Sequence, residues 1–268
     1  MNGKRWLSIL WVLALAGPAA SAEARSKKAP EWKTCSDKII ECAEARDAPC
    51  VEAWEGKLSA LGVSADPGTR ALLTSGNEIA VAAGLLVLQE VGDQRTAEFA
   101  AGLLNQEDYD FKAQVAEKLG MFKGKTVVDA LTGLAGSRRP FEREMAVEAL
   151  GTVGDPAGID ALVTASRDKF FSVRIKACVS MGRFGDPRVV EALGAALASD
   201  GNSGVRVAAA RALGDTKAKA AVPLLIVGLE DSSFTVQSAA YEALKAITKI
   251  DLGATPDEWR SWLKKHSN

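Results

Sequence analysis

Residues 173–187 read VRIKACVSMGRFGDP and belong to a stretch, Asp155–Leu225, whose short motifs repeat. Gly-Asp-Pro at 154–156 recurs at 185–187, and the Val-Arg that opens the quoted segment recurs at 205–206. Successive units are 31 or 32 residues apart. A period of this length is typical of stacked supersecondary units, none of which buries its apolar face alone. The sequence therefore predicts a repeat architecture, and these residues decide the fold.

Six segments align on this repeat, and each has the periodicity of an amphipathic helix. They span residues 80–89, 111–120, 142–151, 173–182, 205–214 and 236–245. The ninth place is a large apolar residue, namely Leu88, Leu119, Leu150, Met181, Leu213 and Leu244. The fifth place is smaller, namely Gly84, Val115, Ala146, Ala177, Ala209 and Ala240. A large residue one turn after a small one lets neighbouring helices approach closely while the large side chain fills the gap.

Other helices are expected between these segments, because apolar residues recur there at i, i+3 and i+6, as at Val128, Leu131 and Leu134. A glycine closes four of the aligned segments, and we interpret it as a left-handed helix cap. These glycines are Gly120, Gly151, Gly182 and Gly214. The Asp-Pro that follows in several units is interpreted as the start of the next helix.

The order Val-Arg, Ala, Ala-Leu-Gly and Gly-Asp-Pro resembles HEAT repeats, in the short form named after phycobilisome lyases. The resemblance covers roughly Asp66 to Lys265, with a degenerate unit that reaches back to Thr34. It implies an all-α fold, a right-handed α-solenoid of about seven helix pairs. In this family the Val-Arg helices line a concave face that holds other proteins.

The repeat also predicts how the chain is divided. Residues 34–65 are expected to form a helical hairpin, residues 66–252 the HEAT-like repeats, and residues 253–268 a C-terminal capping helix. The last helix carries Trp259 and Trp262 on one apolar stripe, which suits a cover for the open end of the solenoid. A binding patch made by these tryptophans is the alternative.

Residues 1–22 have the three-part order of a secretory signal peptide. Lys4 and Arg5 precede an apolar run, Leu7–Ala16, and small residues follow at the expected cleavage site. The run is about half of the roughly 20 residues that a membrane span needs. We therefore expect a periplasmic or secreted protein, with residues 23–33 as a flexible leader and no membrane span in the mature chain. An uncleaved anchor, which would give a membrane-tethered sensor domain, is the alternative.

The cysteines are Cys35, Cys42, Cys50 and Cys178. In an exported protein a disulfide is the default expectation. Cys35 and Cys42 are seven residues apart on one expected helix, which separates them by about 10 Å, too far for a disulfide. Cys42 and Cys50 flank the turn of the hairpin and can meet. We predict a Cys42–Cys50 disulfide, leave Cys35 unassigned, and interpret Cys178 as a buried structural thiol.

Composition argues against several functions. The mature chain would carry 31 basic against 34 acidic residues, so no overall field attracts nucleic acid. The single histidine is His266, so the chain has no Ser-His-Asp set, no Cys-His pair and no metal site that contains histidine. HEAT-like hydroxylases hold two irons with histidine and glutamate ligands, which this chain cannot supply. We expect no enzyme activity and no cofactor.

The resemblance also implies pairs of aspartate and arginine. An aspartate six places before an arginine occurs as Asp168 with Arg174 and as Asp200 with Arg206. The repeat before these lacks the acid, and the repeat after them lacks the arginine. We expect a structural ladder of charge-assisted hydrogen bonds between successive turns, complete only in the middle of the array.

The seventh place of each aligned segment lies about 200° around the helix from both the fifth and the ninth place. It should point away from the core, onto the face that the resemblance makes concave. The predicted partner-binding residues are Glu117, Glu148, Val179, Arg211 and Glu242, with Lys176 beside them. A solvated face without a partner is the alternative for these residues.

The expected function is that of a non-enzymatic exported scaffold, which binds a protein partner on its concave face. The alternative is a lyase-like factor that attaches or holds a chromophore or cofactor on a client protein. Such a factor should have a deep pocket with an acid or a reactive thiol inside, whereas a scaffold should have a shallow, continuous groove.

Overall fold

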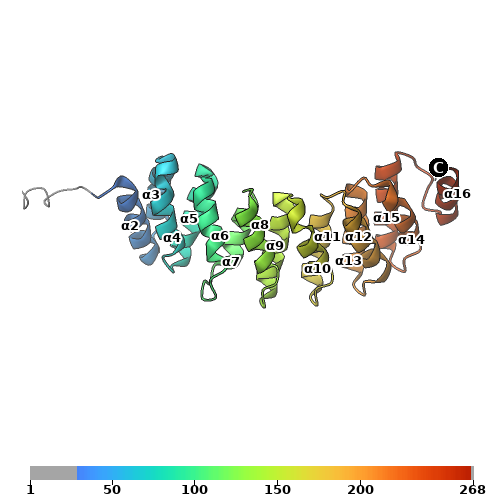
Figure 1. Ribbon diagram of the computed structural model, residues 1–268, viewed down its shortest axis with the longest axis horizontal. Helices are drawn as coiled ribbons and strands as arrows, with labels where there is room; N and C mark the ends of the chain where they lie inside the picture. The colour runs from blue at the N-terminus through green and yellow to red at the C-terminus, as the bar shows by residue number, and fades with distance from the viewer. Residues whose placement is uncertain (1–28, 267–268) are drawn as a thin grey trace, which may run out of the picture.

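The structure is a computed structural model that describes residues 29–266. Over this range the chain consists of fifteen α-helices and three short 3₁₀ turns, with no strand. The helices follow one another in a single elongated row from α2 to α16 (Figure 1). The predicted all-α solenoid is therefore confirmed, while the right-handed sense of its superhelix and the number of its pairs stay predictions.

The helices alternate between two layers, which we call the first and the second helices of each pair. A hairpin of α2 (Glu31–Glu44) and α3 (Ala48–Ser59) and a turn η1 (Gly62–Ala65) precede them. The first helices are α4 (Asp66–Leu73), α6 (Gln94–Leu103), α8 (Lys125–Leu134), α10 (Ile159–Ala165), α12 (Pro187–Ser199) and α14 (Val222–Gly228). The second helices are α5 (Glu78–Val91), α7 (Lys112–Leu119), α9 (Pro140–Val153), α11 (Phe171–Met181), α13 (Ser203–Asp215) and α15 (Phe234–Thr248). Turns η2 (Pro156–Gly158) and η3 (Lys219–Ala221) lead into α10 and α14, and α16 (Pro256–His266) ends the row.

The N-terminal boundary differs from the expected one. The predicted signal peptide and most of the predicted leader lie outside the described residues. However, α2 begins at Glu31, so the last three residues assigned to the leader are helical. Pro30 precedes the helix with φ −53° and ψ 144°, an extended conformation that suits the residue before a first turn. No helix between residues 29 and 266 is long and apolar enough to cross a membrane.

The aligned places of the repeat form one continuous core. All six ninth-place residues are at most 1% exposed, and they belong to the same buried cluster, which runs from Leu73 to Trp259. The fifth place faces the first helix of its own pair. A Cβ added to Gly84 would lie 2.9 Å from the Cβ of Leu72 in α4, and one added to Gly228 in α14 would lie 2.9 Å from the Cβ of Ala240. Small fifth-place residues are thus where the two helices of a pair approach closely.

Enlarging a fifth-place residue should therefore overpack the core. Ala177 and Ala209 are completely buried. We expect Ala177→Leu or Ala209→Leu to lower the free energy of unfolding by about 1–3 kcal/mol, because the added atoms force neighbouring side chains and backbone to move. Thermal melts of the two variants measure this effect. Melting temperatures equal to that of the wild type in both would show that the register is wrong.

The glycines that close the aligned segments do not have the role predicted for them. Gly182 has φ −58° and Gly120 has φ −56°, both right-handed, and Gly151 lies inside α9. The left-handed caps are instead Gly92 after α5, Gly154 after α9 and Lys249 after α15. The prediction of a left-handed cap at the closing glycine is wrong.

The closing glycines provide close contacts between neighbouring second helices. A Cβ added to Gly151 would lie only 2.5 Å from the Cβ of Ser180 in α11. One added to Gly182 would lie 3.1 Å from the Cα of Ala212 in α13. Since these distances are shorter than ordinary van der Waals contacts, the spacing of the second helices depends on the missing side chains.

The last helix covers the end of the core, as predicted. Trp259 of α16 is completely buried, and its indole N–H donates a 2.7 Å hydrogen bond to the carbonyl of Gly253. Arg260 of the same helix forms a 2.7 Å ion pair with Glu230, which follows α14. The tryptophan stripe is thus used for packing, and α16 closes the apolar surface that the last pair would otherwise expose.

Candidate functional site

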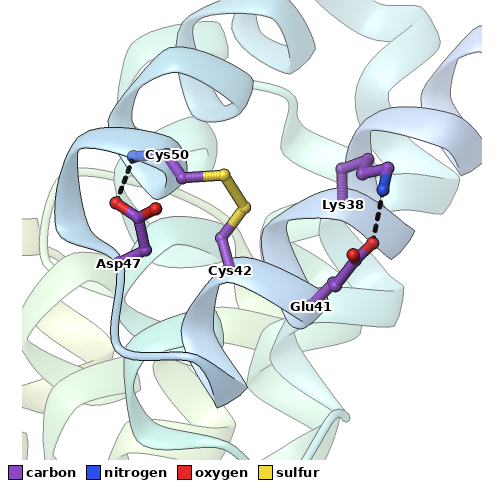
Figure 2. Close-up of a disulfide and its surroundings, with 5 residues drawn as sticks. All are labelled: Lys38, Glu41, Cys42, Asp47 and Cys50. Atoms are coloured by element: carbon purple, nitrogen blue, oxygen red, sulfur yellow. Dashed lines mark hydrogen bonds and ion pairs between the residues drawn. A yellow bond between two sulfur atoms is a disulfide. The ribbon is translucent and has the colours of Figure 1, made fainter.

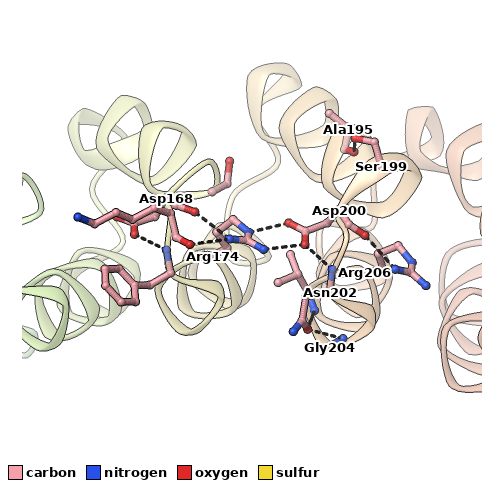
Figure 3. A network of polar contacts seen from close by, with 12 residues as sticks. Asp168, Arg174, Ala195, Ser199, Asp200, Asn202, Gly204 and Arg206 are labelled. Carbon is pink, nitrogen blue, oxygen red and sulfur yellow. Dashed lines mark hydrogen bonds and ion pairs between the residues drawn. The ribbon is translucent and has the colours of Figure 1, made fainter.

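The arginine–aspartate ladder lies where first and second helices join, and its pairing differs from the prediction (Figure 3). Each guanidinium holds the aspartate of the following repeat through two hydrogen bonds. For Arg174 and Asp200 these measure 2.7 Å from Nε and 2.8 Å from Nη2. Arg206 binds Asp231 in the same way, at 2.7 and 2.9 Å. The spacing of six residues suggested that the carboxylate of Asp168 binds Arg174. In the structure it does not, because Arg174 binds Asp200 instead.

The second half of each rung uses the backbone. The Nη1 of Arg174 donates to the carbonyl oxygen of Asp168 at 2.9 Å, and that of Arg206 donates to the carbonyl oxygen of Asp200 at 2.9 Å. The spacing of six is thus real, but it reflects a contact with the main chain. Each arginine ties its own loop to the loop of the next repeat.

The ladder also extends further than predicted. Arg143 binds Asp168 at 2.6 and 2.8 Å, although its own repeat has Ser137 in place of the acid. The Nη1 of Arg143 donates to the carbonyl of Ser137 at 2.8 Å and to that of Arg138 at 3.2 Å, and these backbone contacts do not need an acidic side chain at position 137. At the other end Gln237 donates to the carbonyl of Asp231 at 2.7 Å. The two repeats that seemed incomplete supply the outer partners of the ladder, Arg143 and Asp231. Three full rungs therefore join four consecutive helix pairs.

The ladder lowers the pKa of its carboxylates. Burial by itself would raise the pKa of Asp168 and Asp200, but hydrogen bonds from the arginine and from a backbone N–H more than offset burial, and both pKa values fall below their usual range. The hydrogen bond from Arg206 lowers the pKa of Asp231. These groups stay ionised at neutral pH and are engaged in structure, so they are poor candidates for general acids or bases.

The cysteines of the hairpin form the disulfide that the sequence predicts. Cys42 near the end of α2 is bonded to Cys50 in α3, with 5.8 Å between their Cα atoms (Figure 2). The side chain of Asp47 between them accepts a 3.2 Å hydrogen bond from the N–H of Cys50 and so caps α3. The short turn and its cap bring the two thiols together.

Peptide mapping of the exported protein without reductant tests this disulfide. The peptides that contain Cys42 and Cys50 should be recovered joined. Replacing both with Ser should lower the free energy of unfolding by roughly 2–3 kcal/mol, because the link restricts a short loop of the unfolded chain. Recovery of both cysteines as free, alkylated thiols would rule the disulfide out.

The two remaining thiols are unsuited to nucleophilic chemistry. Cys178 is completely buried, and burial raises its pKa to about 12. Cys35 is 2% exposed, and burial raises the pKa of this thiol as well. Because the thiolate is the reactive form, neither side chain is ready to attack a substrate at neutral pH. Both act as small apolar residues of the core.

The predicted partner-binding residues all lie on the solvent side of the second helices. Glu117, Glu148, Val179, Arg211 and Glu242 are exposed, and Lys176 is half-buried beside them. Lys176 forms a 2.6 Å ion pair with Glu148 of the preceding second helix. Glu117 and Glu242 each pair with a lysine of their own helix, Lys118 and Lys245. The structure thus brings these residues onto one face, where charges of both signs partly neutralise one another.

Two hollows open on this second-helix face. The larger, about 460 Å³, lies between α13 and α15 and is lined by Arg211, Phe234 and Glu242. The other, about 250 Å³, lies between α5 and α7 and is lined by Leu86 and Glu117.

Exposed phenylalanines near this face were missed in the sequence. Phe141, Phe171 and Phe234 are 59%, 54% and 79% exposed, and each lies in the first turn of a second helix. Phe170, the N-cap of α11, is also exposed. The aligned register could have indicated them, because each of the three lies one or two residues before the first place of its segment.

Comparison with known proteins agrees with the geometry. The family model for HEAT repeats matches residues 137–206 and 190–257. The chain therefore contains HEAT repeats, which the family model matches over residues 137–257. No curated protein sequence is similar enough to count as a relative.

Solved structures share the fold at low identity. Kap121p is 14% identical in a mutant form, with a TM-score of 0.61 over 86% of this chain and 30% of that chain. The chain therefore spans about a third of the length of Kap121p. An engineered protein is 19% identical, with a TM-score of 0.51 over 86% of this chain and 74% of that chain. Human deoxyhypusine hydroxylase is 18% identical, with a TM-score of 0.42 over 82% of this chain and 96% of that chain.

Proposed function

We propose that the protein is a non-enzymatic, exported scaffold that binds a protein partner on the exposed face of its second helices. The observation that carries this proposal is where apolar side chains remain exposed. Ten large apolar residues are exposed within the described part of the chain, and six of them lie on second helices. These are Ile79, Leu86, Phe141, Phe171, Val179 and Phe234, and Met121 and Phe170 directly flank second helices. Apolar side chains gathered on one face are typical of interaction sites.

The spacing of the two layers supports a concave shape for this face. Neighbouring second helices meet through glycine and small residues, as at Gly151 and Ser180. In the first layer, a Cβ added to Gly194 of α12 would meet the side chain of Leu224 in α14 instead. Larger contact residues hold helices further apart. A row whose second helices are closer together than its first helices curves towards the second helices.

The charges of this face suit a partner of mixed charge. Glu148 and Lys176 already neutralise each other, while Arg211 and Glu242 line the same hollow. Apolar anchors near the centre of an interface mainly slow dissociation, whereas charges at its rim mainly change the association rate and its salt dependence. Leu86, Val179 and Phe234 would therefore supply most of the affinity.

Reversing two charges tests the proposed face. The double variant Glu148→Arg/Arg211→Glu should stay within about 0.5 kcal/mol of the wild-type free energy of unfolding, because exposed ion pairs contribute little. Capture of partners by the processed protein from an exporting host, quantified by mass spectrometry, should nevertheless fall.

The matched control is Glu191→Arg/Lys219→Glu, which reverses exposed charges on α12 and η3 in the other layer. It should capture the same proteins as the wild type. Undiminished capture by the folded Glu148/Arg211 variant would place the interface elsewhere, with α16 as the next surface to test.

The buried free thiols and the shape of the hollows favour a scaffold and argue against a lyase-like factor. A factor of that kind needs an acid or a reactive thiol inside a deep pocket. Cys35 and Cys178 are buried with raised pKa values, and the hollows on the second-helix face lie between exposed helices. Export is supported by the signal-like order of residues 1–22 and agrees with the Cys42–Cys50 disulfide.

A further inference from the structure

Three cations and three phenylalanines gather on two neighbouring loops, which join the first and second helices of consecutive pairs. The α8–α9 loop and the start of α9 contribute Arg138 and Phe141, and the α10–α11 loop and the start of α11 contribute Arg167, Lys169, Phe170 and Phe171. We call these six residues the basic–aromatic patch. All six are exposed. The loops that contain them lie along one edge of the row (Figure 1).

Contacts within the ladder hold the two loops together. The guanidinium of Arg143 donates to the carbonyls of Ser137 and Arg138 in one loop and binds the carboxylate of Asp168 in the other. It also lies 5.6 Å from the ring centre of Phe170. The rung of Arg143 thus joins the two loops that carry the patch.

The charges of the patch have no partners of opposite sign. Among the ion pairs of the described residues none involves Arg138, Arg167 or Lys169, and Lys169 instead lies 5.3 Å from the ring centre of Phe170. The carboxylate of Asp168, which lies between Arg167 and Lys169 in the sequence, is already bound by Arg143. An anionic partner would therefore meet positive charge that no ion pair among residues 29–266 neutralises.

From this juxtaposition we infer that the patch docks the solenoid, edge first, onto an anionic lipid surface. Aromatic side chains beside lysine and arginine are the combination that binds at the interface of a bilayer, where rings enter the boundary of the acyl chains and cations reach lipid phosphates. Phe141 and Phe171 line none of the hollows described above. Loop tips on an edge can reach a flat surface, whereas a bound peptide or a single-stranded nucleic acid needs a groove.

Neighbouring charges restrict the contact to these two loops. Glu107 and Asp108 of the preceding α6–α7 loop are exposed and acidic, and Asp110 lies 4.0 Å from Arg139. An anionic surface repels that loop, so the contact should be weak, sensitive to salt and defined in orientation. Docking by the edge leaves the outer part of the second-helix face accessible to a protein partner.

Vesicle binding of the processed protein tests this inference. Sedimentation with vesicles of phosphatidylcholine and phosphatidylglycerol should recover the wild type, and vesicles of phosphatidylcholine alone should not. Arg138→Glu/Lys169→Glu should weaken binding about 20-fold or more, since each cation near such a surface contributes roughly a fivefold factor. Phe171→Ser should weaken binding roughly fivefold, because a partly buried ring returns to water.

Matched controls separate the patch from general effects of charge and apolarity. Lys123→Glu/Arg183→Glu makes the same change of net charge in loops on the opposite edge, and Phe234→Ser removes a phenylalanine that is more exposed than Phe171. Both should bind vesicles within twofold of the wild type, and circular dichroism should show all variants folded.

Three results would overturn the inference. The first is equal binding of the wild type to anionic and neutral vesicles. The second is a loss of vesicle binding in the control variants as large as the loss in the patch variants. The third is a patch-dependent association with an oligonucleotide or an acidic peptide in the absence of vesicle binding, which would assign the patch to that partner instead.

Discussion

Arg174→Met is expected to lower the free energy of unfolding by about 2–4 kcal/mol, as measured by urea denaturation at pH 7. The side chains of Arg174 and Asp200 are only 17% and 8% exposed. Removing one partner of a fully buried ion pair costs roughly 3–5 kcal/mol, because the other charge stays buried without a partner. The residual exposure of Arg174 lowers that figure. The variant also loses the hydrogen bond to the carbonyl of Asp168, which joins two loops.

A surface pair of similar geometry provides the control. Lys125 and Asp129 form a 2.6 Å ion pair, but their side chains are 86% and 59% exposed. Lys125→Met should change the free energy of unfolding by less than about 0.5 kcal/mol, since solvent screens such pairs and fixing two long side chains costs entropy. Equal losses in the two variants would mean that the ladder stabilises no more than an ordinary surface pair.

The ladder also predicts how stability depends on pH. The pKa values of Asp168, Asp200 and Asp231 are lowered in the folded protein. A carboxylate with a lowered pKa stabilises the fold above its unfolded pKa, near 3.9 for aspartate, and this contribution is lost as the pH falls through the folded pKa. Wild-type stability should therefore drop below about pH 4. The gap between wild type and Arg174→Met should shrink at pH 3, and a gap that stays constant would contradict the pairing.

The positions that bury large side chains could be predicted from the sequence, because burial follows the helical period directly. Leu150 and Met181 share one place of the repeat, and both are buried. The Cys42–Cys50 disulfide was predictable for a similar reason, since a short turn leaves few geometries for two nearby thiols. Local periodicity and chain length were sufficient in both cases.

The pairing of the ladder could not be decided in this way. Arg143 lies 25 residues before Asp168, and Arg174 lies six residues after it. These two distances add up to one repeat length. An aspartate that lies six residues before one arginine therefore also lies about 25 residues after the arginine of the preceding repeat, and the sequence pattern fits both pairings equally well. Only the direction of the guanidinium, which reaches into the following repeat, decides between them.

The closing glycines were ambiguous for a different reason. Both a left-handed cap and a close helix contact favour glycine, the first because of its backbone freedom and the second because it has no side chain. Gly151 and Gly154 are three residues apart in one repeat, and they divide these two roles. Phe141 and Phe171 lie one and two residues before the first place of their segments, so the register could have indicated them, but the period of the buried places did not single them out.

Gly151→Ala is expected to lower the free energy of unfolding by about 2–3 kcal/mol, although alanine is the better helix former. The new Cβ would lie 2.5 Å from the Cβ and 2.6 Å from the Oγ of Ser180. Overpacking of this kind costs about 1–3 kcal/mol or more, because helices have to separate. It would also disturb the 3.0 Å hydrogen bond that the hydroxyl of Ser180 donates to the carbonyl of Val147. Thermal and urea denaturation both measure the loss.

Gly56→Ala is the matched control, because Gly56 also lies inside a helix, α3, and a Cβ there would meet no atom within 4 Å. This variant should be stabilised by about 0.5–1 kcal/mol, since alanine loses less backbone entropy on folding. The opposite signs of the two changes would show that contact, and not helix propensity, decides the outcome at Gly151.

The double variant Gly151→Ala/Ser180→Gly identifies what limits the spacing of the second helices. The added Cβ would lie 2.8 Å from the Cα of Ser180, so removal of the serine side chain leaves a clash with the backbone itself. We therefore expect the double variant to remain at least as unstable as Gly151→Ala. Recovery of wild-type stability would mean that the serine side chain sets the distance. Persistent instability would mean that the two backbones are in direct contact and that this contact sets the spacing of the second helices.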